Sequence, residues 1–382
     1  MNLTDQLDRL SLFEPAPYPV VSLYLNTQPG PVGRDQFQAF IRKEFAGRAD
    51  TYQNGSSERA SLDRDLERIS HYLENELQPS SNGVAVFACS AGELFETVQL
   101  SAPIEQHSLY IGDRPHLYPL ARVESQYPRY AVVVTDTNSA RILVIATGEV
   151  VTEREVKGVK TRRTSQGGWS QARFQRHIAN FHLQHVKEVI DALEHIVQQE
   201  GLTQIVLSGD EVVTPLLREQ MPKHLADKVV EHVRLDTRAP LDDVLETTLE
   251  AMKRQNGRTD REKVEAAIGG YRSGGLGVVG PEATLEALMK RQVEELLVTA
   301  SVNNLRALSP SAQAAANDAG LSEPAVETTV AGEAAQGAPE VVRLADELVA
   351  QAKQNAARIT FIEDPELLQR HGGVAALLRF RI

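Results

Sequence analysis

A short glycine-rich segment between residues 166 and 174 combines residue types that suit contact with a nucleic acid. Its sequence is Gln166-Gly167-Gly168-Trp169-Ser170-Gln171-Ala172-Arg173-Phe174. The paired glycines permit backbone angles and a close approach that a Cβ atom forbids. Trp169 offers a flat ring on which a base can stack, which is worth about 1–3 kcal/mol per base. The amide of Gln171 is a candidate for orienting a water molecule or contacting a ribose.

The charged residues around the glycines are mostly basic. Seven bases and one acid, Glu155, lie between residues 154 and 176, which gives a local charge of +6. The bases are Arg154, Lys157, Lys160, Arg162, Arg163, Arg173 and Arg176. The whole chain carries −12, which argues against nucleic acid as a general partner, because phosphate binding depends on Lys and Arg that release counterions. A local patch can nevertheless bind against the average charge.

A long helix is predicted directly after the glycines, from about Ser170 to Gln199. Apolar residues recur there at helical spacing, at Phe174, Ile178, Phe181, Val186, Val189, Leu193 and Ile196. Gly201 is a typical residue for ending it. The free N–H groups and the dipole at the start of a helix favour an anion. A basic, glycine-tipped loop on such a helix suits insertion into a phosphate-lined RNA cavity. Without reference to any family, a basic surface loop before a helix explains the same residues.

Two other chemistries fit the helix less well. His182 and His185 are spaced i, i+3 and could share a metal ion. No third ligand accompanies them, so we expect RNA contact or packing and no metal. Ser170 and His177 resemble a nucleophile and its base. They lie seven residues apart, which is about 10 Å along a helix axis, too far for a hydrogen bond.

The segment Gly275-Leu276-Gly277-Val278-Val279-Gly280 matches the dinucleotide-binding pattern of three spaced glycines before a helix. That motif needs a strand immediately before it, whereas residues 267–274 have the composition of a Gly/Ser/Arg loop. We therefore expect Val278 and Val279 to form a strand themselves, and we predict no cofactor.

The chain is expected to be an α/β protein in three blocks. In residues 1–127, β-rich runs at 20–25 and 83–88 flank an amphipathic helix at 59–77. Residues 128–266 begin with a hairpin at 130–134 and 141–145. They continue with the basic loop, the long helix, a strand at 205–207 and helices at 212–225 and 241–255.

In residues 267–382, strands are expected at 276–279, 293–299, 359–362 and 374–380, with helices at 282–291 and 341–355. The run 307–339 is rich in Ala, Ser, Gly, Pro and Glu and lacks Lys and Arg. It is predicted to be a disordered insertion, because it can bury too little apolar surface to offset its ordering entropy.

The composition indicates a soluble cytoplasmic protein. The N-terminus has no secretory pattern, and no stretch approaches the roughly 18–20 apolar residues that cross a membrane. The single cysteine, Cys89, cannot form an internal disulfide or a zinc cluster, which fits a reducing compartment.

Gly167-Gly168, followed by Arg173-Phe174 and Arg176, resembles the loop and helix of archaeal and eukaryotic class 1 release factors, which carry Gly-Gly-Gln. The C-terminal block also resembles that family's last domain, through its strands at 277–279 and 293–298 and its ending Gly372-Gly373-Val374-Ala375-Ala376-Leu377-Leu378-Arg379-Phe380. The resemblance covers roughly residues 130–382. It implies a bacterial member of this Pelota-like superfamily, which includes ribosome rescue and hibernation factors, with three domains of mixed sheets and flanking helices.

The resemblance implies binding to the ribosomal A site, with an N-terminal domain on the decoding side and the 167–171 loop directed towards the peptidyl-transferase centre. Gly167, Gly168, Trp169 and Ser170 would approach RNA there. The basic residues Lys157, Lys160, Arg162, Arg163, Arg173 and Arg176 would contact rRNA or tRNA phosphates. The C-terminal domain would engage a translational GTPase.

Trp169 stands where the family has its catalytic glutamine, and the first block lacks the family's stop-codon-reading motifs. We therefore expect hibernation or rescue rather than codon-specific termination. Two alternatives stay open: a peptidyl-tRNA hydrolase that uses Gln171, and a protein-interaction scaffold that binds no RNA.

Overall fold

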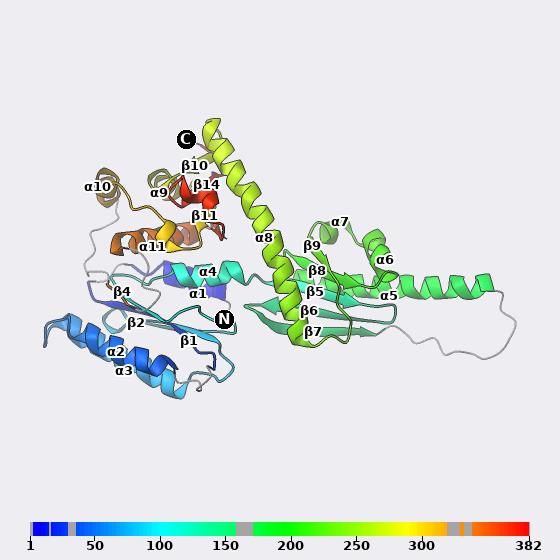
Figure 1. Cartoon of the computed structure of the whole chain (residues 1–382), viewed down its shortest axis with the longest axis horizontal. Coiled ribbons are helices and arrows are strands. Elements are labelled where there is room, and N and C mark those ends of the chain that lie inside the picture. The colour runs from blue at the N-terminus through cyan, green and yellow to red at the C-terminus, as the bar shows by residue number, and fades with distance from the viewer. Residues whose placement is uncertain are drawn as a thin grey trace. The chain divides into compact units, whose positions relative to one another are not determined.

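The computed structural model describes residues 3–14, 17–29, 36–157, 171–318, 329–331 and 338–381, with side chains except at 36, 171–177, 315–318 and 329–331. It contains three sheets with flanking helices, so the predicted mixed α/β fold class is confirmed (Figure 1). The chain forms two compact units. Unit 1 comprises residues 1–126 and 257–382, and unit 2 comprises residues 127–256. The predicted first and last blocks thus lie in one compact unit.

The first sheet of unit 1 is antiparallel. Its strands, in spatial order, are β12 (Thr329–Ala331), β4 (Ser108–Gly112), β1 (Val20–Asn26), β2 (Gly83–Cys89) and β3 (Leu94–Leu100). Helices α2 (Gln36–Ala49) and α3 (Ser57–Asn75) pack against it through a shared apolar core. Ser56 caps α3, because its hydroxyl accepts from Arg59 N at 3.1 Å. The predicted strands and helix of the first block are confirmed.

The second sheet of unit 1 has the order β10 (Gly277–Val279), β14 (Val374–Leu378), β11 (Val293–Thr299) and β13 (Arg358–Ile362). β11 and β13 are parallel, whereas β14 runs antiparallel to its neighbours. Helices α9 (Pro281–Met289) and α11 (Pro339–Gln354) accompany it. Pro281 occupies the first turn of α9, where its missing N–H costs nothing. The predicted strands and helices of this block are confirmed.

Helices α1 (Leu3–Ser11), α4 (Tyr118–Gln126) and α11 contact one another and join the two sheets of unit 1 (Figure 1). Glu124 of α4 receives hydrogen bonds from Thr4 of α1 at 2.6 Å and from Lys353 of α11 at 2.8 Å. Gln354 donates to the backbone oxygen of Ser11 at 2.5 Å. Segments at opposite ends of the chain are thus held together by specific polar contacts as well as by packing.

The sheet of unit 2 has the order β7 (Glu149–Lys157), β6 (Ser139–Ala146), β5 (Tyr130–Thr135), β8 (Ile205–Gly209) and β9 (Val229–Val233). β5, β6 and β7 form an antiparallel meander, and β5, β8 and β9 are parallel. One core lies beneath α5 (Gln171–Gln199), α6 (Val213–Gln220) and α7 (Lys223–Ala226). A second contains Val244 and Met252 of α8 (Leu241–Arg272). The predicted hairpin is confirmed, and Asp136 closes its turn by accepting from Asn138 N and Ser139 N.

Three predictions differ from the structure. Residues 154–157, expected in the basic loop, belong to β7, an edge strand whose exposed positions carry charged side chains instead of an apolar run. Helix α8 continues to Arg272, so residues 267–272 are helical and not a loop. Within 307–339, residues 310–318 form helix α10 and residues 329–331 form β12, which pairs with β4. Tertiary pairing of this kind leaves no periodic pattern in the sequence.

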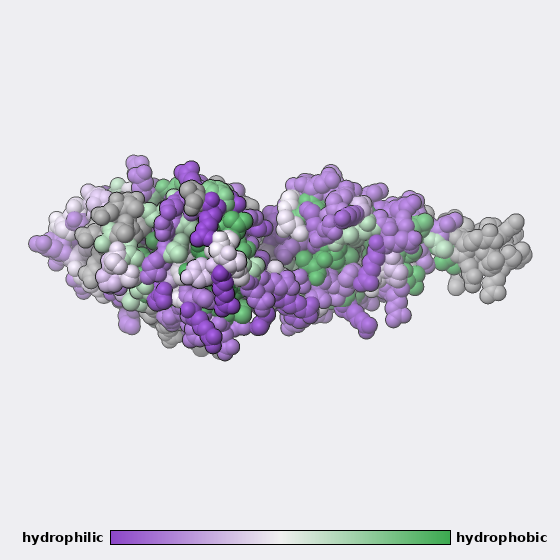
Figure 2. All heavy atoms as spheres, turned by 90° about the horizontal axis from the view of Figure 1, so that it is seen from above, coloured by the Kyte–Doolittle hydropathy of each residue, from purple (hydrophilic) through white to green (hydrophobic). Residues whose placement is uncertain are grey.

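No helix in the described part of the chain has the length and apolarity needed to cross a bilayer. Figure 2 shows that hydrophilic residues cover most of the face seen there.

Candidate functional site

The glycine loop connects β7 to α5 in unit 2. Most of its predicted site residues lie outside the described residues: Lys160, Arg162, Arg163, Gly167, Gly168, Trp169 and Ser170. Helix α5 begins at Gln171, close to the predicted start, and ends at Gln199 before Gly201 in a left-handed conformation (φ +63°). Arg173 and Arg176 belong to its first two turns, and their side chains lie outside the described part.

The strand that enters the loop is an edge strand with mixed charges. Glu155 and Lys157 form an ion pair at 2.8 Å, and Glu153 pairs with Arg141 of the neighbouring strand at 2.9 Å. Side chains alternate between the faces of a strand, so Arg154 shares its face with Val156. Val156 packs against the core beneath α5, which places Arg154 on the α5 face of the sheet. Arg154 is exposed there.

The ion pair with Glu155 affects the charge of the Lys157 side chain. The hydrogen bond with Glu155 raises the pKa of Lys157, and the same contact lowers the pKa of Glu155. Both side chains are more than half exposed. Exposed pairs of this kind contribute little stability, and a competing phosphate could take the place of the carboxylate. Lys157 therefore keeps a charged ammonium group close to the loop.

The helix that leaves the loop is only partly packed on its unit. Val186, Val189, Leu193 and Ile196 are buried, as their spacing predicts. Residues 178–184 contain no buried side chain, and Ile178 is 36% exposed. Figure 1 shows α5 extending past the strands of its sheet. Fourteen residues, 171–184, correspond to about 20 Å of helix at 1.5 Å per residue, so the first residues of α5 lie well away from the core.

Two alternative sites can now be assessed within the described residues. His185 is buried with neither ring nitrogen hydrogen-bonded, whereas His182 is partly exposed, and no group of three possible metal ligands is found in the described part. The glycine pattern at 275–280 has a packing role. A Cβ on Gly277 would lie 2.1 Å from Ala267 O, so its absence lets β10 lie against the backbone of α8.

One buried group of side chains was not predicted. In unit 1, His116 Nδ1 lies 2.6 Å from Asp346 Oδ2, and both residues are buried. Asp346 Oδ1 accepts from Leu117 N at 2.9 Å and Tyr118 N at 3.1 Å, at the start of α4. Arg114 forms an ion pair with Glu347 beside this group. The partners lie about 230 residues apart in sequence, so spacing alone carries no signal for them.

In a comparison with known protein families, one family model matches part of the chain. Residues 115–253 match the model of the bacterial archaeo-eukaryotic release factor family 10. This range contains the glycine loop and α5, so it supports the resemblance drawn from their residues, and it does not extend to residues 254–382. No curated protein sequence matches the chain.

Several solved structures are similar to this chain at low identity. The archaeal translation termination factor aRF1 is 16% identical, with 99% of this chain and 97% of that chain covered and a TM-score of 0.26. Archaeoglobus fulgidus Pelota is 15% identical over 80% and 82% of the two chains, with a TM-score of 0.34. S. cerevisiae Dom34 is 10% identical over 78% and 81%, with a TM-score of 0.39. With such low scores, these structures add no argument to the family match.

Proposed function

We propose that this chain, whose residues 115–253 match the model of the bacterial archaeo-eukaryotic release factor family 10, occupies the ribosomal A site and directs the 167–171 loop towards the peptidyl-transferase centre. The observation that carries the proposal is the family match over the glycine loop together with the projecting start of α5. The protein then acts in hibernation or rescue, from the cytoplasm, and contacts rRNA and tRNA.

The charges near the loop support RNA as the partner. The local +6 between residues 154 and 176 contrasts with the −12 of the chain. Arg154 and Lys157 are exposed on β7, and the positive end of the α5 dipole begins at Gln171. Ribosomal RNA offers phosphates at high density, so Arg162, Arg163, Arg173, Arg176 and Lys160 would each displace counterions on binding.

Binding is tested by co-sedimentation with purified ribosomes at several salt concentrations. The change of Arg162, Arg163, Arg173 and Arg176 to Ala should weaken binding. It should also reduce the slope of log K against log salt by about 3, at roughly 0.7–0.9 per lost phosphate contact. A matched control changes four exposed bases elsewhere in unit 2, which alters the net charge equally: Arg234, Arg238, Lys253 and Arg254. If the two variants weaken binding equally, or neither does, the loop is not the ribosome-binding element.

Occupancy without hydrolysis is favoured over peptide release. Trp169 takes the place of the family's catalytic glutamine, and Gln171 is the first residue of α5. Its backbone is part of a helical turn, so moving its amide to the place of a loop glutamine would require that turn to unwind. A misplacement of about 1 Å can already cost a hundredfold in rate.

Peptide release from stalled ribosome–nascent-chain complexes separates the two chemistries. We expect bound protein and no released peptide above the level of a buffer control. Release that disappears in Gln171→Ala would establish the hydrolase alternative instead. Ribosome binding by Gln171→Ala should equal that of the wild type in either case.

We also infer that the second sheet of unit 1 engages a protein partner, which the family resemblance suggests is a translational GTPase. Tyr271, Leu276 and Phe380 are each about half exposed, at 53%, 49% and 46%. Leu276 O accepts from Leu378 N at 3.1 Å, so the residue before β10 lies next to the end of β14, two residues before Phe380. Exposed apolar side chains gathered at an edge strand are typical of interaction surfaces. The triple change to Ser should abolish capture of a purified translational GTPase and leave ribosome binding intact.

A further inference from the structure

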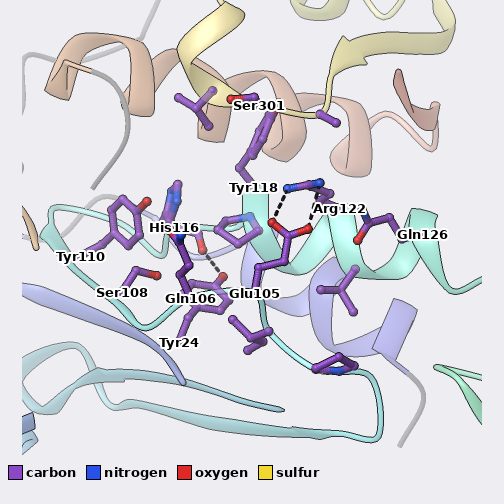
Figure 3. Close-up of a pocket in the computed structure, with 16 residues that line it drawn as sticks. Tyr24, Glu105, Gln106, Ser108, Tyr110, His116, Tyr118, Arg122, Gln126 and Ser301 are labelled. Atoms are coloured by element: carbon purple, nitrogen blue, oxygen red, sulfur yellow. Dashed lines mark hydrogen bonds and ion pairs between the residues drawn. The ribbon is translucent and has the colours of Figure 1, made fainter. Parts of the chain in front are cut away.

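A pocket of about 130 Å³ lies within unit 1, where α4 meets the first sheet and the turn that follows β11 (Figure 3). Its walls include the rings of Tyr24, Tyr110, His116 and Tyr118. One ordered water needs about 10–15 Å³ of such space, so the pocket has room for a larger molecule. It is separate from the glycine loop, which belongs to unit 2.

The contact with Asp346 indicates which nitrogen of the His116 ring carries a proton. An ionised carboxylate only accepts hydrogen bonds. Asp346 Oδ1 accepts from two backbone N–H groups, so the carboxylate acts as an acceptor in this group. Nδ1 of His116 therefore carries the proton that is shared with Asp346 Oδ2 at 2.6 Å. In the neutral ring, Nε2 then presents a lone pair.

That lone pair has no partner in the described part of the chain. His116 is 2% exposed, and its Nε2 atom is buried without a hydrogen bond. Buried polar atoms nearly always have a partner, so this acceptor beside the pocket is available to a ligand bound there. The ring is held in place by the Tyr110 ring, with centroids 3.6 Å apart. Figure 3 shows the two rings side by side on the pocket wall.

The side chain of Gln126 supplies a hydrogen-bond acceptor at the rim of the pocket. Gln126 donates through Nε2 to Glu363 at 2.9 Å, so its amide oxygen is left to accept. Arg122 pairs with Glu105 at 3.2 Å and with Glu363 at 3.5 Å. Glu363 lies outside the pocket lining, but it shares Arg122 with Glu105, so the charge of this guanidinium is already neutralised by carboxylates. A ligand with a phosphate or carboxylate group is disfavoured there.

The tyrosines supply flat, neutral surfaces. Burial raises the pKa of Tyr24, Tyr110 and Tyr118 well above the usual range, so all three stay protonated. Tyr24 donates its hydroxyl proton to His116 O at 2.5 Å, and Tyr118 donates to Thr299 O. The hydroxyls of Tyr24 and Tyr118 are therefore already hydrogen-bonded within the protein, so a ligand in the pocket would contact their rings. Aromatic walls of this kind favour a planar ligand.

We propose that this pocket binds a planar, non-anionic heterocycle with exocyclic N–H donors, of the aminopurine or aminopyrimidine class, as a free small molecule. The ligand donates one hydrogen bond to His116 Nε2 and another to the amide oxygen of Gln126, while its ring lies against the tyrosines. The proposal does not depend on ribosome binding.

Isothermal titration calorimetry of the full chain with adenine, adenosine, purine and AMP tests the chemistry. We expect adenine and adenosine to bind. Purine lacks the exocyclic amine and should bind about tenfold more weakly, which corresponds to one hydrogen bond. AMP should bind at least tenfold more weakly than adenosine because of Glu105 and Glu363. The absence of adenine binding, or equal binding of AMP and adenosine, would overturn the proposal.

Variants test the place of binding. His116→Asn keeps a side-chain N–H at the position of Nδ1, so it retains the bond to Asp346 but loses the Nε2 acceptor. Gln126→Leu removes an acceptor at the rim. Each should weaken adenine binding about tenfold or more, whereas His71→Asn, at an exposed position of α3, should change nothing. Adenine binding that survives both pocket variants refutes the site.

A spectroscopic measurement keeps the proposal falsifiable if His116→Asn does not fold. The ¹⁵N chemical shift of His116 Nε2 in the wild type should move towards that of a hydrogen-bonded acceptor when adenine is added. An unchanged shift under saturating adenine would refute the proposal, even if adenine binds elsewhere.

Discussion

Replacing Asp346 by Ala tests whether one buried carboxylate holds the two parts of unit 1 together. The side chain accepts three hydrogen bonds, from His116 Nδ1, Leu117 N and Tyr118 N. All three donors belong to the first half of the chain, whereas Asp346 belongs to α11. The substitution leaves buried donors without an acceptor, and breaking a buried pair typically costs about 3–5 kcal/mol. We therefore expect a loss of about 4 kcal/mol in the free energy of unfolding of unit 1.

The expected loss is a large share of the 5–15 kcal/mol that is usual for a whole domain. For a domain of 150–250 residues it corresponds to a drop of about 8–16 °C in the melting temperature, at 2–4 °C per kcal/mol. Differential scanning calorimetry gives the melting temperature. Hydrogen exchange followed by mass spectrometry assigns the loss to α4, where the amides of Leu117 and Tyr118 should become unprotected.

Asp210→Ala is the matched control. Asp210 also accepts from two backbone N–H groups at a helix start, from Val212 at 3.0 Å and Val213 at 2.7 Å, but it is exposed and lies in unit 2. Loss of such a cap costs about 1 kcal/mol. If Asp346→Ala costs no more than Asp210→Ala, the buried network does not join the two parts and our reasoning is refuted.

Other predictions concern the stability of unit 1. Burial raises the pKa of Asp65 to about 6, so the folded state binds more protons than the unfolded state between about pH 4 and 6. Its contribution to stability therefore falls as pH rises through that window. Asp65→Asn should remove this decline in urea unfolding at pH 4.5 and 7.5; an unchanged pH slope contradicts it. Gly277→Ala should destabilise unit 1 by more than about 2 kcal/mol, because its Cβ would lie 2.1 Å from Ala267 O. Gly257→Ala, in open space on α8, should stabilise by about 0.5–1 kcal/mol, and thermal unfolding compares the two; equal effects would contradict the packing argument.

The elements of the fold that the sequence predicts well are those with a local signal. The hairpin at β5 and β6 is predicted by two apolar runs around an Asp-Thr-Asn turn. Helix α5 is predicted by the spacing of its apolar residues and by Gly201, which follows it. The strand β10 was placed correctly, since its valines suit a strand better than a phosphate-binding turn. In each case neighbouring residues alone determine the conformation.

Elements stabilised by distant partners were not predicted. β7 alternates charged and half-buried residues, and only its pairing with β6 makes it a strand. The last turns of α8 contain Gly269 and Gly270, which argue against a helix locally, yet Gly270 fits closely against the backbone of Gly277. His116 and Asp346 meet only because two sheets far apart in the sequence share one unit. No single-sequence pattern reports such a meeting.

The split arrangement of unit 1 has a consequence for how the protein is made. Residues 127–256 form unit 2 and interrupt unit 1, whose second part begins at Gly257. During synthesis the strands β1 to β4 of the first sheet emerge first, but β12, α11 and Asp346 emerge only near the end of translation. Domains usually fold as units once their residues are available. Unit 2 should therefore fold before the second half of unit 1 has been synthesised, and the surface of α4 that will contact α11 should be uncovered until then.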